Sequence, residues 1–286
     1  MASLIALAPS PVVSRATFVE TPVDVDAASG LFGVLTRPQE SPRDTGFIFI
    51  NAGLLHRVGP FRLYVDIARR LAQSGFASIR LDLSGKGDSD ALSGVSLAES
   101  NIANISAAYG KLKQETGVTK FSLGGLCSGA DDALQAGPEF DNLAGIFMFD
   151  GYAPKTTRYY INRFGPKLFS ARSWFNRIKP ASSQGEQSGG GVGGMRNWGT
   201  PREMLDRYAT LVDQGAHILA IFSGWNGNCY VYPSQLISAI NHPGTPSLVS
   251  ELHFPDATHL FPISRHRRLA IDGVVDWAER SFGGRT

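Results

Sequence analysis

Residues 121–129, which read FSLGGLCSG, decide the fold of this chain. A short apolar run leads into the pattern G-x-C-x-G at residues 125–129, and the residues that follow can continue as a helix. This spacing is that of a nucleophile elbow with sulfur where a hydroxyl usually sits. Because the chain turns sharply from strand to helix, side chains two residues before and after the nucleophile would collide, so glycine is needed at both positions. The pattern therefore predicts that Cys127 is a nucleophile.

Two backbone N–H groups are expected to face the atom that Cys127 attacks. The N–H of Ser128 opens the helix and points toward a developing oxyanion. A second donor is expected from the loop after the strand at residues 46–50, and we place it at Leu54. Together Ser128 and Leu54 form the predicted oxyanion hole.

Strand and helix signals alternate on both sides of the elbow. Strands are expected at residues 15–21, 31–37, 46–50, 76–83, 120–126, 143–149, 217–223 and 248–254. Helices are expected at residues 62–74, 96–116, 132–135, 233–240 and 265–282. Such alternation predicts an α/β fold in which a mostly parallel, doubly wound sheet carries helices on both faces. We expect one domain over residues 1–286.

Residues 151–205 interrupt the alternation after the sixth strand. They are rich in Tyr, Arg, Trp and Pro, and they contain a Gly-rich stretch at residues 182–194. A segment of this kind cannot bury enough apolar area to offset its chain entropy. We therefore expect a lid or cap insertion over the sheet, with a mobile Gly-rich stretch inside it.

A thiol nucleophile needs a base, and in this architecture the base follows the last strand. Of the six histidines, only His259 lies in that place, just before the terminal helix. His259 would take the proton of Cys127, whose thiolate attacks a carbonyl and forms a thioester. The acyl group would then pass to water or to a second substrate.

The residue that orients His259 is less directly indicated. Hydrolases of this shape carry an acidic residue after the strand that follows the insertion, but residues 222–228 offer amides and no carboxylate. We expect Asp150 to orient the imidazole, because it ends an apolar strand at the rim of the site. Asn226 is the alternative, since an amide can orient a Cys–His pair. Asp256 is expected to shape the turn before His259.

Composition narrows the classes of function. The net charge of +2 is too small to indicate nucleic acid or a membrane surface as partner. No apolar stretch approaches the roughly 20 residues of a membrane-spanning helix, and the N-terminal MASLIALA lacks the basic start of a signal peptide. Two cysteines provide no disulfide framework, so a reducing, cytoplasmic setting is expected.

Three motifs taken together resemble those of the α/β-hydrolase superfamily. They are the elbow around Cys127, the run R-x-D-x-x-G-x-G-x-S at residues 80–89, and the segment Asp-Ala-Thr-His that ends at His259. Residues 51–60 and the GLCSGA run also resemble bacterial hydrolases found beside exosortase or acyl-carrier systems. The resemblance covers nearly the whole chain and implies an α/β-hydrolase fold. Cysteine in place of serine, and the missing carboxylate after residues 217–223, are departures that argue against a simple esterase.

These observations predict an acyl-transfer enzyme of Cys-His-Asp type, a thioesterase or acyltransferase that passes through a thioester acyl-enzyme. Its partner would be a small-molecule acyl substrate, including a thioester of a carrier protein or CoA, and neither a metal nor another cofactor is expected. One alternative is an ester or lactone hydrolase of the dienelactone type. Another is a catalytically idle protein that binds a ligand in the same pocket. The sequence leaves open whether the protein is a homodimer.

Overall fold

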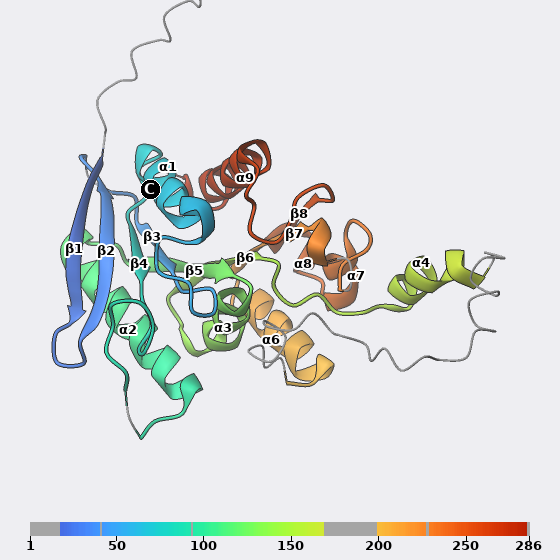
Figure 1. The fold of residues 1–286 in the computed structure, drawn as a ribbon, viewed down its shortest axis with the longest axis horizontal. Coiled ribbons are helices and arrows are strands. Elements are labelled where there is room, and N and C mark those ends of the chain that lie inside the picture. Colours follow the sequence, from blue (N-terminus) through green and yellow to red (C-terminus); the bar gives the residue numbers. More distant parts are fainter. Residues whose placement is uncertain (1–17, 41, 93, 169–198, 227–228, 285–286) are drawn as a thin grey trace, which may run out of the picture.

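The computed structural model describes residues 18–40, 42–92, 94–168, 199–226 and 229–284. Its centre is an eight-stranded sheet with the order β1-β2-β4-β3-β5-β6-β7-β8, and helices cover both faces of it (Figure 1). The strands are β1 (Phe18–Asp26), β2 (Leu31–Pro38), β3 (Thr45–Phe49), β4 (Ser78–Leu81), β5 (Lys120–Leu126), β6 (Leu143–Phe149), β7 (His217–Ser223) and β8 (Val249–Phe254). The predicted α/β-hydrolase arrangement of a mostly parallel, doubly wound sheet is confirmed.

The direction of the strands determines where a site can form. β2 runs antiparallel to both β1 and β4, whereas every pair from β4 to β8 across the sheet is parallel. The carboxyl ends of β3, β5, β6, β7 and β8 therefore lie along one edge. In open α/β sheets, ligands bind at that edge.

Two helical layers enclose the sheet. α1 (Leu63–Gln73) and α9 (Ser264–Phe282) cover one face, and α2 (Leu97–Thr116), α3 (Ser128–Ala136) and α6 (Pro201–Asp213) cover the other (Figure 1). Each layer closes a separate apolar core against the sheet. The remaining described elements are η1 (Pro60–Arg62), η2 (Gly137–Glu139), α4 (Thr157–Leu168), η4 (Gly224–Asn226), α7 (Gln235–Ile240) and α8 (Thr245–Leu248).

Local signals explain the ends of α2. Ser96 accepts a hydrogen bond from the N–H of Glu99, whose carboxylate in turn accepts one from the N–H of Ser96. This capping box satisfies N–H groups that have no partner inside the helix. Gly117 ends α2 in the left-handed region at φ 76°, a conformation that glycine adopts without strain. The predicted range, 96–116, thus differs from the observed helix by one residue.

Other predicted boundaries were wrong by more. β1 continues to Asp26, whereas the prediction ended it at residue 21, because its antiparallel pairing with β2 extends to Asp26. β4 is shorter than the predicted 76–83 and spans only Ser78–Leu81. By contrast, the helix after β3 differs from its predicted range by only one residue at each end: it begins at Leu63, since Arg62 has a left-handed φ of 64°, and it ends at Gln73.

The described residues of the region predicted as a lid include α4 and the start of α6. The expected boundary at residue 205 falls inside α6, where Met204 and Tyr208 are buried in the core beside the sheet. α4 extends away from the sheet (Figure 1). Residues 169–198, which include the Gly-rich stretch 182–194, lie outside the described residues, so the lid stays a prediction. None of the helices described here is both long and apolar enough to cross a membrane.

Candidate active site

The turn between β5 and α3 has the geometry of a nucleophile elbow. Cys127 has φ 58° and ψ −121°, a strained conformation for a residue with a side chain. A Cβ atom on Gly125 would lie 2.8 Å from the carbonyl oxygen of Ile50, and one on Gly129 would lie 2.5 Å from that of Asn51. Both glycines are therefore required by the close approach of the β3 end, as the sequence predicts.

The elbow is tied to its neighbours by backbone hydrogen bonds. The N–H of Cys127 donates to the carbonyl oxygen of Phe149 at 2.9 Å, which joins it to the end of β6. One residue earlier, the N–H of Leu126 donates to the hydroxyl of Tyr64 at 2.6 Å. Tyr64 is buried beneath the turn. The hydrogen bonds to Phe149 and Tyr64 offset the backbone strain at Cys127.

Asp150 and His259 meet at the same edge of the sheet. Nδ1 of His259 lies 2.8 Å from Oδ2 of Asp150, and the Asp150 side chain is fully buried. Since a carboxylate can only accept, Nδ1 carries the proton and Nε2 is left for Cys127. Asp150 has φ 49°, so strained backbone again occurs at this edge. The structure thus brings Asp150, the residue expected to orient the imidazole, onto His259.

Ser223, the last residue of β7, holds the carboxylate from the other side. Its N–H donates to Oδ1 of Asp150 at 2.7 Å, and its hydroxyl donates to Oδ2 at 2.6 Å. These bonds satisfy a buried charge that would otherwise be costly. The acid therefore comes from the end of β6 and is held by the end of β7, where related folds usually place the acid itself.

The imidazole of His259 is strongly affected by its neighbours. Burial lowers its pKa, but hydrogen bonds with Asp150 and Cys127, and the charges of both, raise that pKa from 6.5 to about 9. The net effect of these neighbours favours the protonated imidazole. Cys127 thus lies close enough to the imidazole to raise its pKa.

The predicted oxyanion loop lies against the elbow. The N–H of Gly53 donates to the hydroxyl of Ser128 at 2.6 Å, so the side chain of Ser128 fixes the loop. Ser128 is the first residue of α3, so its own N–H has no partner inside the helix. Leu54 is 75% exposed. Ser128 and Leu54 as oxyanion donors stay a prediction.

A buried network anchors the same loop from below. Asn51 donates to Oδ1 of Asp82 at 2.7 Å and accepts from the N–H of Leu83 at 2.6 Å. The N–H of Arg57 also donates to Oδ1 of Asp82 at 2.7 Å, and the Arg57 guanidinium bonds the second oxygen of that carboxylate. Asp82 is fully buried. The run at residues 80–89 therefore fixes the start and the end of the oxyanion loop.

One group of possible metal ligands occurs among the described residues, and a cation of the protein already occupies it. The ligand atoms of His56, Asp82 and Asp88 all lie within 4.8 Å of one another. The Arg57 guanidinium bonds Asp82 and lies 2.6 Å from Oδ2 of Asp88. The hydrogen bond to Arg57 and its charge lower the pKa of Asp88. A side-chain cation thus pairs with both carboxylates.

Sequence reasoning missed two residues of this site. Ser223 and Trp225 both touch the Asp150–His259 pair, but a serine that ends a strand and a tryptophan that follows it carry no local signal for that role. The side chain of Asn226, the alternative partner of His259, lies outside the described part of the chain. Asp256 is exposed in the turn closed by the bond from Ala257 N–H to the Phe254 carbonyl, which agrees with the structural role expected for it.

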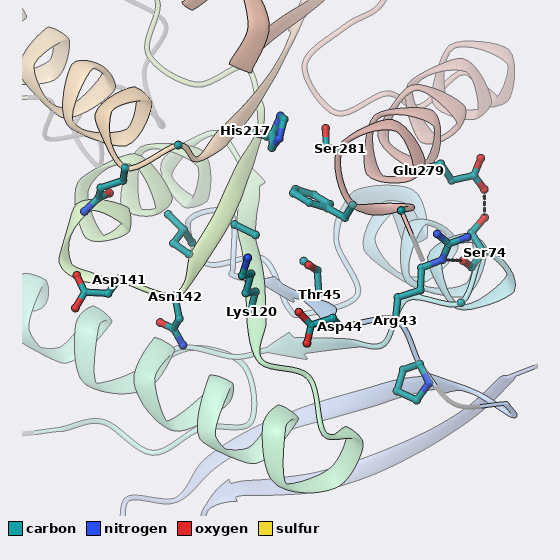
Figure 2. A pocket seen from close by; sticks show the side chains of 18 of the residues that line it. Arg43, Asp44, Thr45, Ser74, Lys120, Asp141, Asn142, His217, Glu279 and Ser281 are labelled. Carbon is teal, nitrogen blue, oxygen red and sulfur yellow. Dashed lines mark hydrogen bonds between the residues drawn. The ribbon is translucent and has the colours of Figure 1, made fainter. Parts of the chain in front are cut away.

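A larger hollow lies at the opposite end of the sheet (Figure 2). Its volume is about 1100 Å³, and the first residues of four strands line it: Thr45, Lys120, Leu143 and His217. Its polar groups partly satisfy one another. Ser74 donates to Glu279 at 2.6 Å, for example.

Comparison with solved structures identifies the fold. The structure is similar to a dienelactone hydrolase from Anabaena variabilis, with a TM-score of 0.56, 15% identity and coverage of 92% of this chain and 98% of that one. It is similar to Est1E from Butyrivibrio proteoclasticus, with a TM-score of 0.56, 15% identity and coverage of 93% and 99%. A Pyrococcus furiosus esterase gives a TM-score of 0.59 at 12% identity, with coverage of 96% and 97%.

The chain therefore has the α/β-hydrolase fold over nearly its whole length. By sequence, it matches no family model and no curated protein. At such low identity, the structural likeness establishes the fold and leaves the chemistry to be argued from the site.

Proposed function

We propose that this protein hydrolyses carboxylic esters or lactones through Cys127, with His259 as acid and base and Asp150 as the residue that orients it. The single observation that carries the proposal is the chain of contacts from buried Asp150 through His259 to Cys127 on a strained elbow. A titratable group with a perturbed pKa, as His259 has here, at the ligand-binding edge of such a sheet is a mark of active sites. The esterases and the dienelactone hydrolase that share the fold support the ester or lactone as substrate class.

The sulfur chemistry follows from the protonation of His259. A thiolate is the reacting form of cysteine, and a protonated imidazole beside it serves as its counter-ion. The thiolate attacks the ester carbonyl, and the oxyanion accepts hydrogen bonds from the N–H groups of Ser128 and Leu54. His259 then gives its proton to the departing alkoxide, which leaves as alcohol, and the acyl group remains on sulfur as a thioester.

Deacylation uses the same groups in the reverse sense. Neutral His259 takes a proton from water while the water oxygen attacks the thioester carbonyl. The C–S bond breaks, the carboxylic acid leaves, and the thiolate–imidazolium pair is restored. Each oxyanion donor is worth about 2.7–4 kcal/mol in enzymes of this kind, so the bond that fixes Gly53 on Ser128 has a catalytic consequence.

A second candidate is the thioesterase or acyltransferase activity expected from the sequence. Sulfur as nucleophile favours it, because the acyl-enzyme is itself a thioester and exchanges readily with thioester substrates. The structural neighbours support it less well than ester or lactone hydrolysis, since those named here are esterases and a dienelactone hydrolase. Carrier-protein and CoA thioesters are therefore the second class of substrate to test.

Trapping of the acyl-enzyme tests the proposal directly. The protein is mixed with p-nitrophenyl butyrate, quenched in acid within milliseconds to seconds, and examined by intact mass and peptide mass spectrometry. We expect a butyryl adduct on Cys127 that hydroxylamine removes. Cys127→Ala should lose both adduct and turnover, whereas Cys229→Ala is the matched control and should keep both.

Substrate choice separates the candidates. The kcat/KM for p-nitrophenyl butyrate and for the lactone dihydrocoumarin is compared with that for butyryl-CoA. Higher values for ester and lactone support the first proposal, and a higher value for the CoA thioester supports the second. If the Cys127 thiol stays unmodified with all three substrates, both proposed activities are contradicted, and the protein is then interpreted as one that binds a ligand without catalysis.

A further inference from the structure

Trp225 lies face to face with the imidazole of His259. The two ring centroids are 4.1 Å apart, and the ring planes are inclined by 28°. About half of Trp225 is exposed, whereas only 12% of the His259 side chain is. The indole therefore covers one face of the imidazole and is itself partly open to solvent.

The chain around Trp225 is built so that the indole reaches this place. The N–H of Gly224 donates to the carbonyl oxygen of Ala257 at 3.0 Å, which joins the end of β7 to the loop before His259. A Cβ atom on Gly224 would lie 1.9 Å from the carbonyl oxygen of Pro255, so only glycine permits this approach. Ser223, immediately before it, holds Asp150. Within residues 223–225, Ser223 thus holds the carboxylate of Asp150 and Trp225 covers the imidazole of His259.

The electrostatic surroundings of the imidazole favour its protonated form. Asp150 from the end of β6 and Cys127 from the elbow both act on its ring. His253 on β8 feels the charge of Asp150, and Asp256, in the same loop as His259, is exposed. The face of an indole attracts a cation more strongly than the face of any other side chain. The stack is therefore favoured when the ring is protonated.

We propose that Trp225 is a positioning residue, whose indole face holds the His259 ring in line with Cys127 and stabilises its protonated form. The inference rests on the role proposed for His259 in catalysis. It adds a fourth member to the Cys127–His259–Asp150 site, at the position where the acid stands in related folds.

A side chain that only covered the imidazole would shift the pKa of His259 in the opposite direction from a side chain that attracts its protonated form. Burial lowers the pKa of a histidine, so a side chain that only excludes water would hold the pKa of His259 down. A π face that attracts the imidazolium raises it. Trp225→Leu keeps an apolar cover and removes the π face, whereas Trp225→Phe keeps both.

The pKa of His259 in the resting protein measures this difference. The Cε1 proton of each histidine is followed by NMR between pH 5 and 10, and the signal missing in His259→Gln identifies the right one. Trp225→Leu should weaken proton binding about two- to fivefold, a fall of roughly half a pH unit in the pKa. Trp225→Phe should stay near wild type. Phe61→Leu, which also removes an exposed aromatic ring, should change nothing.

Turnover provides a second readout. The pH profile of kcat/KM for p-nitrophenyl butyrate should move in Trp225→Leu by the same amount as the His259 titration, and Trp225→Phe should restore it. A pKa that is unchanged or raised in Trp225→Leu would overturn the proposal and leave Trp225 as a cover. The NMR titration needs no turnover, so failure of the proposed hydrolase activity is distinguished from failure of the stack.

Discussion

The two ends of the parallel sheet differ in how their polar groups are used. At the amino end, a hollow of about 1100 Å³ is lined by groups whose hydrogen bonds connect element ends, such as the bond from Arg43 Nε to the Ser74 carbonyl (Figure 2). At the carboxyl end, Asp150 is fully buried, bears on His259, and has strained backbone, as Cys127 does. The difference teaches that convergence of buried, strained, titratable groups marks the site better than the size of a hollow.

The physical cause is the direction of the strands. Loops that leave the carboxyl ends lead into helix N-termini, whose free N–H groups attract negative charge. The elbow places such an N-terminus, that of α3, beside Cys127. The amino ends receive helix C-termini instead, and Arg43 meets the Ser74 carbonyl at the end of α1 there.

The largest expected effect follows from changing one carboxylate at each end. Asp150→Asn removes the charge that orients and stabilises protonated His259, so kcat for p-nitrophenyl butyrate should fall by about 10³–10⁴. Asp141→Asn makes the same chemical change beside the opposite hollow and should leave kcat within about twofold of wild type. Circular dichroism and urea unfolding of both variants check that they fold. A loss of activity in Asp141→Asn, or retained activity in Asp150→Asn, would contradict the placement of the active site at the carboxyl end of the sheet.

A second effect concerns how stability depends on pH at the two ends. The folded protein raises the pKa of His259 from 6.5 to about 9, so it binds a proton more tightly than the unfolded chain does. The resulting stabilisation is complete below pH 6.5 and is lost as pH rises to about 9, by about 1–3 kcal/mol in free energy of unfolding. Urea unfolding at pH 6 and pH 9.5 should show this loss in wild type and much less of it in His259→Gln.

His217 at the amino end should show the opposite sign. Burial lowers its pKa, so the unfolded chain binds the proton more tightly and stability falls as pH drops below 6.5. His217→Gln should therefore reduce the loss of stability between pH 7 and pH 5.5, and leave the loss between pH 6 and pH 9.5 intact. Equal behaviour of the two variants would show that neither histidine carries the effect.

A smaller effect is expected from the hydroxyl that fixes the oxyanion loop. Ser128→Ala leaves the N–H of Gly53 without its acceptor, which costs about 0.5–1.5 kcal/mol. We expect kcat to fall about two- to tenfold with little change in KM, in steady-state assays with p-nitrophenyl butyrate. Ser74→Ala likewise removes a serine hydroxyl with one hydrogen bond, which this hydroxyl donates to Glu279 at the amino end of the sheet. This variant should leave kcat unchanged. Similar kcat values for the two variants would show that the loop does not need this bond.

The smallest expected effect is that of a substitution at Lys120, at the amino end of the sheet. Lys120 begins β5, the strand that leads to the elbow, yet its side chain is exposed beside the hollow. Lys120→Met should change kcat by less than about twofold and the free energy of unfolding by less than about 0.5 kcal/mol. A larger fall in kcat would assign the hollow a part in the reaction.

The sequence predicted best those elements that carry local signals. The capping box at Ser96 and the glycine at position 117 bound α2 to within one residue. A similar capping box, formed by Thr200 and Glu203, begins α6, yet composition led us to assign residues up to 205 to the insertion. Tertiary packing of Met204 and Tyr208 decides in favour of the helix there. Composition of a segment is thus a weaker guide than its caps.

The sequence alone determined the elbow motif and the alternation of strands and helices, because each depends on neighbours a few residues away. The catalytic roles of Cys127 and His259 stay predictions. The sequence favoured Asp150 over Asn226 as the partner of His259, but only the tertiary structure showed the contact between Asp150 and His259. Only the tertiary structure showed that Ser223 donates hydrogen bonds to Asp150 and that Trp225 covers the imidazole. Asp150 and His259 are 109 residues apart, and they meet because β6, β7 and β8 lie side by side in the sheet. Local periodicity carries no record of strand order, so contacts between loops of different strands emerge only when the sheet is assembled.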